Sequence, residues 1–432
     1  MGVRLQFEGI RCFSDPQEAV IRPITLLVGE NSSGKTTFLA LCRIAYALAN
    51  GQKTVALFNE TPFWLGAYDQ IATYRGGRRG YVASFTITIH VDDRTGRSSL
   101  RTEYTSLGGQ PVPRVSRLEV GGLVIQQTNR DGEPPSILMS GSQGTVNFPF
   151  DRFLEGVPEG DQIPLWGGLA KHEIEAGGGA SVFSQSDWES KDRALRAIQQ
   201  EFRRYPYAIA PIRTSPLRTY DPIGAEPSPE GSHVPMLLAA LSRSSHQQQW
   251  IALQSALKEF GSESGLFEDI EIVEKGKKES DPFQVGVRSG GRTFNLIDVG
   301  YGVSQALPIL VDTLRRNSAF ETFLLQQPEV HLHPKAQAEL ASFFAKQADQ
   351  NRRFVIETHS DHLVDRIRME VRRKRLTPED VSLLYFERRK SSAMIHNLEL
   401  DRNGSNNQPT ARVSAIFLER RARVAGYLGC AS

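Results

Sequence analysis

An eight-residue segment near the N-terminus, GENSSGKT at residues 29–36, limits most strongly what this chain can form. It follows a short apolar run at residues 24–28. It precedes a stretch at residues 36–50 whose apolar side chains recur every three or four positions, as in a helix. A strand, a glycine-rich loop and a helix in this order are typical of a phosphate-binding loop, in which backbone N–H groups and the helix N-terminus hold the phosphates. The sequence therefore predicts a nucleotide site, with a chance match in a Gly/Ser-rich turn as the alternative.

The residues expected to contact the nucleotide belong to this loop and to the first turn of the following helix. Lys35 reaches the β- and γ-phosphates, and the hydroxyl of Thr36 is a ligand for Mg²⁺. The glycines are needed because a side chain would block the close approach of the phosphates. ATP and Mg²⁺ are therefore the expected cofactors, and the nucleotide-binding residues are Gly29, Asn31, Ser32, Ser33, Gly34, Lys35, Thr36 and Thr37.

A second motif, DVGYGVSQALPIL, occupies residues 298–310. Its Ser304 stands near the expected start of a helix, where a hydroxyl and the helix dipole can together meet an anion. The Gly302-x-Ser304-x-Ala306 core is also similar to the nucleophile turn of a serine hydrolase. No strand leads directly into it, however, and no Asp and His in triad order support that alternative. An ordinary glycine loop capped by Ser304 is the remaining alternative.

The third motif, LLQQPEVHLHP, stands where a strand should end in an acid that binds Mg²⁺, followed by a catalytic glutamate. Those two positions hold Gln326 and Gln327. Glutamine can contact Mg²⁺ or orient a water through its amide, but it cannot act as a general base, so slow turnover is expected. The nearest acid, Glu329, is the other catalytic candidate, with a charge at a helix N-terminus as the alternative. His331 and His333 have no third ligand nearby in the sequence and are expected to be structural.

The fourth motif, VIETHSDHL, ends a further apolar strand, and His359 follows that strand. A histidine in this position can sense the γ-phosphate, although a lone histidine at a strand end is usually structural. Gln70, ahead of a predicted strand, is a weaker candidate for a Mg²⁺ ligand, with the neighbouring Asp69 as a competing choice. Arg213 and Arg218, in the segment PIRTSPLRTYDP, can touch phosphate in the same or a second subunit. Solvated or structural arginines are the alternative.

Taken in order, these motifs resemble those of ABC-type ATPases. The set GENSSGKTT, PIRTSP, GYGVSQ, QPEVHLHP and ETHSDHL, followed by EDVSLLYFE, resembles bacterial AAA-family ATPases of the SMC/OLD-like group with a short C-terminal domain of unknown function. The resemblance implies ATP-driven head-to-tail homodimerisation, in which Ser304 contacts the γ-phosphate held by the other subunit. It also implies regulation of a separate nuclease or effector protein in bacterial defence, since many relatives act in anti-phage systems. Only about 70 residues follow His359, about half a domain, so no intrinsic nuclease site is expected.

The expected fold class is α/β, an ABC-type P-loop ATPase head with an antiparallel β patch and a mixed insertion. The expected domains are an N-terminal lobe with the glycine-rich loop at residues 1–107, an insertion or lid at 108–282, and a C-terminal lobe with the other three motifs at 283–432. In the insertion, Ser186 and Glu189 predict a capping box at the start of one helix. A second helix is expected over residues 235–260 and should stop at Gly261. A last helix is expected at residues 412–427.

Composition leaves the choice of partner open. The 51 Lys and Arg residues against 49 Asp and Glu give a net charge of +2, which indicates no global preference for nucleic acid. No apolar run approaches the ~18 residues of a membrane span, so no membrane partner is expected. Three well-separated cysteines fit a reducing cytoplasm. Two alternatives to an effector-regulating head remain. One is a nucleic-acid-binding ATPase of the DNA-repair type, which basic clusters at 372–375 and 388–390 favour. The other is a hydrolysis-poor scaffold that binds ATP only to dimerise.

Overall fold

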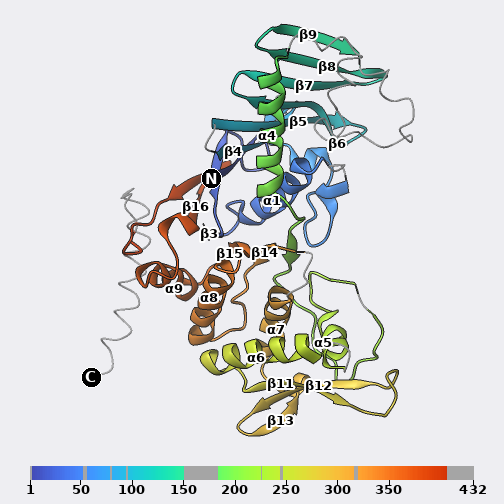
Figure 1. The fold of residues 1–432 in the computed structure, drawn as a ribbon, viewed down its shortest axis with the longest axis vertical. Coiled ribbons are helices and arrows are strands. Elements are labelled where there is room, and N and C mark those ends of the chain that lie inside the picture. Colours follow the sequence, from blue (N-terminus) through green and yellow to red (C-terminus); the bar gives the residue numbers. More distant parts are fainter. Residues whose placement is uncertain are drawn as a thin grey trace.

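Three β-sheets organise the computed structural model of the chain (Figure 1). The structure describes residues 2–51, 56–77, 80–93, 96–149, 183–224, 226–243, 247–315 and 320–405, and the helix expected at 412–427 lies outside these residues. The central sheet has six strands in the order β10-β14-β15-β3-β16-β17. Their bounds are Tyr207–Ile209 for β10, Thr322–Gln326 for β14, Arg353–Glu357 for β15, Ile24–Gly29 for β3, Val381–Arg389 for β16 and Ser392–Leu398 for β17.

The central strands are apolar along their length because helices cover both faces of the sheet. Every residue of β14 is buried. One face packs on α1 (Lys35–Ala49), and the other packs on α8 (Pro334–Ala348) and α9 (Asp361–Arg372). Strands β14, β15, β3 and β16 run parallel, so their carboxyl ends meet at one edge. This edge carries the glycine-rich loop and the two strand-end motifs predicted from the sequence.

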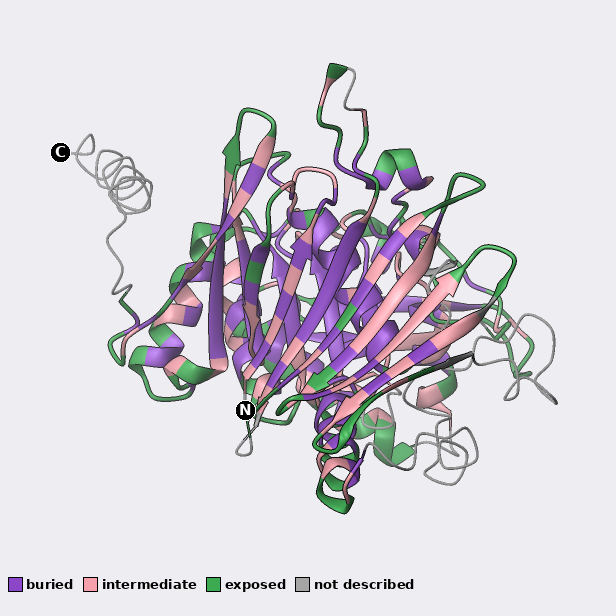
Figure 2. Ribbon diagram, turned by 90° about the horizontal axis from the view of Figure 1, so that it is seen from above, coloured by how far each residue is buried: buried purple, intermediate pink, exposed green. Residues whose placement is uncertain are grey.

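An eight-stranded antiparallel sheet covers the other side of α1, in the order β2-β1-β4-β5-β6-β7-β8-β9. Its strands are β2 (Gln17–Ile21), β1 (Gly2–Glu8), β4 (Phe85–Asp93), β5 (Gly96–Leu107), β6 (Gln110–Val120), β7 (Leu123–Arg130), β8 (Glu133–Gly141) and β9 (Gly144–Pro149). Figure 2 shows burial decreasing from the strands over α1 toward the outer hairpins. The expected α/β fold with an antiparallel β patch is therefore confirmed. The expected boundary at 107/108 falls in the β5–β6 hairpin of this continuous sheet.

The first insertion helix begins two residues earlier than the capping box predicted. Helix α4 (Gln185–Glu201) lies along the antiparallel sheet. Its N-cap is Ser184, whose Oγ accepts from the Asp187 N–H at 3.2 Å, while Asp187 Oδ2 accepts from the Ser184 N–H at 2.8 Å. The predicted capping box of Ser186 and Glu189 was wrong. A second possible pair, Ser184 and Asp187, lies two residues earlier in the sequence and forms the cap instead.

The expected helix over residues 235–260 is two helices, α5 (Val234–Ser242) and α6 (Gln247–Ser264). Gly261 lies inside α6 and does not end it, so that prediction was also wrong. A Cβ at this glycine would lie 2.4 Å from the Phe267 carbonyl oxygen. The glycine therefore allows the chain leaving α6 to return against the helix.

A third sheet, β11 (Asp269–Glu274), β12 (Phe283–Ser289) and β13 (Arg292–Asn295), packs near α5 and α6 and leads into α7 (Tyr301–Leu314). The expected boundary at 282/283 falls within the antiparallel β11–β12 pair. The division of the chain into three domains stays a prediction. Among the described helices, none is long and apolar enough to cross a bilayer.

Candidate nucleotide site

A loop connects the end of β3 to the N-terminus of α1. Gly34 is the N-cap of α1, no side chain caps this helix, and its first turn holds no acid. The first N–H groups of α1 are therefore open to an anion. Lys35 is buried at this end, and its Nζ donates to the carbonyls of Glu30 at 2.6 Å and Gly29 at 3.2 Å. Burial lowers the pKa of Lys35, and the carboxylates of Glu357 and Glu30 partly offset that effect.

The two glycines of the loop are required by the protein itself. Gly29 has φ +141°, and a Cβ there would lie 2.3 Å from the Phe386 carbonyl oxygen on β16. Gly34 has φ +97°, and its Cβ would lie 2.6 Å from Cys12 Sγ and 2.7 Å from Phe13 Cζ. The sequence predicted glycine at these positions to leave room for the phosphates. The structure adds two further reasons for glycine, which are the positive φ angles and the close packing against neighbouring segments.

The other residues of the loop divide by exposure. Asn31 and Ser32 are exposed, while Ser33 is buried and its Oγ donates to the Glu30 carbonyl at 2.7 Å. The side chain of Ser33 is thus occupied within the loop, which leaves its main chain for a ligand. Thr37 Oγ1 accepts from Arg11 Nη1 at 3.2 Å.

Thr36 meets an acid that comes from a different strand than the one expected. Its Oγ1 donates to Glu357 Oε2 at 2.7 Å. Glu357 ends β15, the strand that separates β3 from β14, and it pairs in register with Gln326. Burial raises the pKa of Glu357, while the Thr36 hydrogen bond and the charge of Lys35 act in the opposite direction. The hydroxyl expected to bind Mg²⁺ therefore has a carboxylate beside it, although Gln326 and Gln327 offer none.

The segment after β14 turns back toward β15. Gln327 has φ 43°, and its N–H donates to the Glu357 carbonyl at 2.8 Å. Two residues later, Glu329 Oε1 accepts from the backbone N–H of His359 at 2.7 Å. Glu329 is buried, and its Oε2 has no hydrogen-bond partner among the described residues. The turn therefore places Glu329 over the end of β15, one strand away from the P-loop strand.

Glu329 is held in an environment that disfavours its charge. Burial raises its pKa, and hydrogen bonds from His359 and Thr358 together with the charge of Arg213 act against that rise. Arg213 is also buried, and burial lowers its pKa to about 10. The side chain of His359 is exposed at the same edge. A γ-phosphate-sensing role for His359 stays a prediction.

Gln70 occupies a short helix next to the site. It lies in α2 (Tyr68–Ile71), and its Oε1 accepts from the Ala67 N–H at 3.0 Å. Arg11 connects this segment to α1, since it donates to the carbonyls of Gln70 and Leu65 and to Thr37. The sequence analysis missed Arg11, because a lone arginine in a short turn belongs to no motif. A Mg²⁺-binding role for Gln70 requires its side chain to leave this cap and stays a prediction.

Ser304 lies in the first turn of α7, as the second motif predicted. It is buried, and its Oγ donates to the Tyr301 carbonyl at 2.9 Å. The surface at this end of α7 is formed by Tyr301, whose ring lies 5.7 Å from that of His331. His333 caps α8 through Nδ1, which accepts from the Ala336 N–H at 3.3 Å. Contact of Ser304 with a second subunit's nucleotide stays a prediction.

Half of the basic cluster at 372–375 is already paired. Glu370 is fully buried, and both Arg373 and Arg375 form ion pairs with it, at 3.6 and 3.2 Å. Arg389 at the second cluster pairs with Glu387 at 3.2 Å. These pairs reduce the positive charge that the two clusters offer to phosphates.

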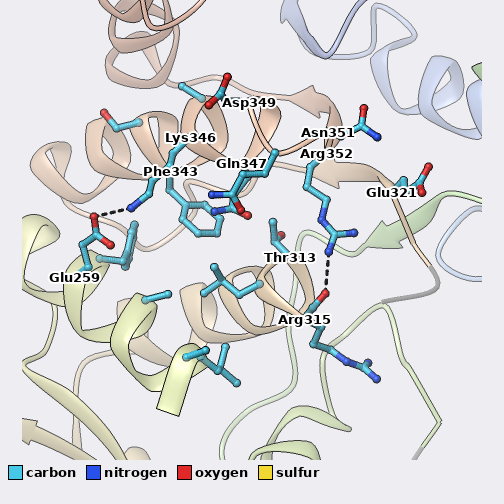
Figure 3. A pocket seen from close by; sticks show the side chains of 18 of the residues that line it. Glu259, Thr313, Arg315, Glu321, Phe343, Lys346, Gln347, Asp349, Asn351 and Arg352 are labelled. Atoms are coloured by element: carbon cyan, nitrogen blue, oxygen red, sulfur yellow. Dashed lines mark hydrogen bonds and ion pairs between the residues drawn. The ribbon is translucent and has the colours of Figure 1, made fainter. Parts of the chain in front are cut away.

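A hollow of about 1080 Å³ lies away from this site and opens between α6, α8 and the end of α7. Figure 3 shows the Glu259–Lys346 ion pair at one side of it and Arg352 against the Arg315 carbonyl at the other. A P-loop holds phosphates in a shallow nest of backbone groups, so the nucleotide site need not coincide with the deepest hollow.

A mostly parallel sheet with a phosphate-binding loop at its carboxyl edge and an antiparallel sheet on α1 defines the class of this protein. The fold is thus an α/β fold of the P-loop type. Residues 254–365, about a quarter of the chain, match the family model described as "AAA domain, putative AbiEii toxin, Type IV TA system". The matched stretch contains α7, β14 and β15, with Glu329 and His359.

Three solved structures are among those to which this chain is similar. The Smc head bound to the C-winged helix domain of ScpA is 9% identical with a TM-score of 0.48, over 92% of this chain and 97% of that chain. The SMC head domain from Thermotoga maritima is 11% identical with a TM-score of 0.42, over 93% and 100%. The Smc head with an extended coiled coil bound to the C-terminal domain of ScpA, derived from Pyrococcus furiosus, is 10% identical with a TM-score of 0.43, over 97% and 98%. No curated protein matches the sequence.

Proposed function

We propose that this head binds ATP·Mg²⁺ on the loop of residues 29–36, hydrolyses it, and forms a head-to-tail homodimer that controls a separate effector protein. The observation that supports the proposal most is the 2.7 Å hydrogen bond from Thr36 to Glu357. It brings a carboxylate from β15 to the P-loop hydroxyl, where β14 ends in glutamines. The chain therefore has an acid in the place where hydrolysis needs one.

The residues at this point fit a magnesium ion. Mg²⁺ prefers hard oxygen ligands and usually takes only one or two from the protein, with phosphate and water oxygens for the rest. The Thr36 hydroxyl and the Glu357 carboxylate are such a pair, and Gln326 at the neighbouring strand end offers an amide oxygen. No group of three or more His, Cys, Asp or Glu is close enough for a metal in the described part of the chain. When bound, Mg²⁺ neutralises charge on the β- and γ-phosphates.

Glu329 is the best-placed group to take the proton of the attacking water. Its Oε1 is fixed by the His359 N–H, and its Oε2 is buried without a partner among the described residues. The water oxygen attacks the γ-phosphorus, its proton passes to Glu329, and the bond from the γ-phosphorus to the bridging oxygen breaks to release ADP and phosphate. Lys35 and the N-terminus of α1 hold the phosphates during this step. Because Gln327 turns the chain at positive φ, the base stands two residues beyond its usual position.

An exposed apolar patch supports dimerisation at this face. Ile212 is 80% exposed and Tyr301 is 61% exposed, and Leu217 and Ile297 are exposed as well. The two segments that carry them are tied together, since Arg218 makes hydrogen bonds of 2.7 and 3.0 Å to Asp298. Exposed apolar side chains on two segments that are tied together favour burial against a partner. A second copy docked here would bring its own P-loop toward the N-terminus of α7.

Regulation of an effector in bacterial defence is the wider role that we infer. The resemblance to ATPases of anti-phage systems supports it, as does the family description that names a toxin of a toxin–antitoxin system. A cytoplasmic location is part of this proposal and follows from the cysteine usage.

The experiment that tests the function is steady-state phosphate release by Glu329→Gln. We expect turnover to fall by about 10²–10⁴-fold, the usual cost of losing a general base, while ATP binding measured by calorimetry stays close to that of the parent. Glu321→Gln is the matched control, because Glu321 stands just before β14 at the opposite end of the strand. A Glu329→Gln variant that turns over like the parent would refute the assignment of the base.

A further inference from the structure

Arg213 is a buried arginine at the edge of the site that the proposed reaction leaves without a role. It lies four residues beyond β10, the edge strand next to β14. Only 3% of it is exposed, although the preceding Ile212 faces solvent. Its charge acts on Glu329. Neither side chain, however, forms a direct ion pair within the described residues.

The contacts of Arg213 lead in two directions. Its backbone N–H donates to Gln305 Oε1 at 3.3 Å, and its Nη2 donates to the Gln327 carbonyl at 3.5 Å. Gln305 follows Ser304 on α7, the helix whose N-terminus carries the exposed Tyr301. Gln327 begins the turn that carries Glu329. Arg213 therefore stands between the helix that faces the proposed second subunit and the turn that holds the proposed base.

The guanidinium is incompletely bonded where it lies. Its Nε and Nη1 are buried and have no hydrogen-bond partner among the described residues, and the same is true of Glu329 Oε2. Buried N–H groups are normally all paired, because each loses its hydrogen bond to water on burial. Helix movements of about 1–2 Å are common at subunit interfaces. A movement of α7 would act on Arg213 through the hydrogen bond between its backbone N–H and Gln305.

We propose that Arg213 is a positioning residue that connects the first turns of α7 to the Gln327–Glu329 turn, so that docking of a second copy on α7 sets Glu329 in place for hydrolysis. The inference rests on the proposed function, since it requires Glu329 to act on water. Lysine cannot replace the arginine, because one ammonium group does not reproduce the several N–H directions of a planar guanidinium.

The test is a double-mutant cycle on turnover with Arg213→Lys and Gln305→Ala, each measured against protein concentration at saturating ATP. We expect each single variant to lower kcat by about two- to thirtyfold, the range of coupling found along such connections, with the KM for ATP and the self-association unchanged within about twofold. We expect the double variant to be no slower than the slower single variant, because both changes break one connection. Arg353→Met is the control. Arg353 is a partly buried arginine at the opposite end of β15, paired with Glu201 at 2.7 Å, and its loss should lower the melting temperature without changing kcat.

Losses that multiply in the double variant would show that Arg213 and Gln305 act independently and would overturn the proposal. Parental kcat in Arg213→Lys would overturn it as well. If Arg213→Lys does not fold, as judged by its melting curve, Gln305→Ala decides alone, and parental kcat in that variant is the refuting result. Failure of the proposed function looks different, because Glu329→Gln would then hydrolyse ATP like the parent.

Discussion

Replacing Glu357 with glutamine tests whether the Glu357 carboxylate or the Gln326 amide oxygen is the ligand beside the metal. The substitution keeps the size of the side chain and leaves an amide oxygen to accept from Thr36 Oγ1, now 2.7 Å away. What it removes is the negative charge. That charge attracts a bound Mg²⁺ and repels the phosphates of metal-free ATP. The variant should therefore bind ATP·Mg²⁺ more weakly than the parent, and in EDTA it should bind ATP more tightly.

The size of the effect follows from the charge of the group that the substitution removes. A hydrogen bond or metal interaction with a charged partner contributes about 1.5–3 kcal/mol, so we expect the Kd for ATP·Mg²⁺ to rise about ten- to 150-fold. The substitution should not lower the stability of the folded protein at the same time. Burial raises the pKa of Glu357 above its ordinary 4.5, so the folded state disfavours the charged form at neutral pH. A neutral glutamine should therefore melt at or above the parent's temperature near pH 7. This advantage should shrink as the pH falls through the raised pKa of Glu357 and should be gone below about 4.5, where the carboxyl is protonated in both the folded and the unfolded state.

The measurement is isothermal titration of ATP into parent and Glu357→Gln, first with Mg²⁺ and then with EDTA. The variant should bind ATP more weakly than the parent with Mg²⁺ and more tightly in EDTA. Lys35→Ala is the reference for loss of phosphate binding under both conditions, because its contribution does not depend on the metal. Equal affinities of parent and Glu357→Gln for ATP·Mg²⁺ would refute the reasoning. In that case Gln326 at the end of β14 would be the protein's Mg²⁺ ligand beside Thr36. Weaker binding in both Mg²⁺ and EDTA would instead show that Glu357 only supports the fold of the loop.

Further outcomes follow from the same geometry. Gln327→Glu should leave turnover within about threefold of the parent because Glu329 already supplies the base; a gain of about tenfold or more in phosphate release would assign the base to position 327. Burial raises the pKa of Glu329, so kcat should fall as the pH decreases through a value above 4.5; a pH–rate profile without this limb in the parent would contradict the role, and Glu329→Gln should lack it. Tyr301→Asp should weaken ATP-dependent self-association in light scattering, whereas Tyr74→Asp, an exposed tyrosine outside the patch, should not; equal behaviour of the two would place the dimer interface elsewhere.

Local features of the nucleotide site could be predicted from the sequence because they depend on neighbouring residues. The loop, Lys35 and the start of α1 follow from one strand–glycine–helix segment. Strand β14 and helix α8 also depend on local patterns, an apolar run and a proline-led helix. The cap of α4 was misplaced because two polar patterns overlap. The expected single helix at 235–260 was wrong because helical spacing continues across a break between two helices.

The partners of these residues could not be predicted in the same way. Arg11 reaches Thr37 from a turn after the first strand, and Gly34 is constrained by Cys12 and Phe13 from that same turn. Glycine is thus required at position 34 by packing against residues outside the loop, which the loop motif alone does not predict. The basic cluster at 372–375 looked free in the sequence, yet buried Glu370 holds two of its arginines.

The class of fold, the order of the motifs and the position of the phosphate-binding loop could all be inferred from the amino-acid sequence, since each depends on periodicity and on residues a few positions apart. The sequence also showed that β14 ends in two glutamines, and from these residues slow hydrolysis was the natural prediction. Glu329 was already a candidate from its place in the sequence, but the position of Glu329 and Glu357 at one edge of the sheet became visible only in the folded chain. Glu357 is 321 residues from Thr36 in the chain, and parallel pairing of β15 with β3 brings the two side chains to one edge. Glu329 reaches the same edge because Gln327 turns the backbone at positive φ, a conformation set by the hydrogen bond from its N–H to β15.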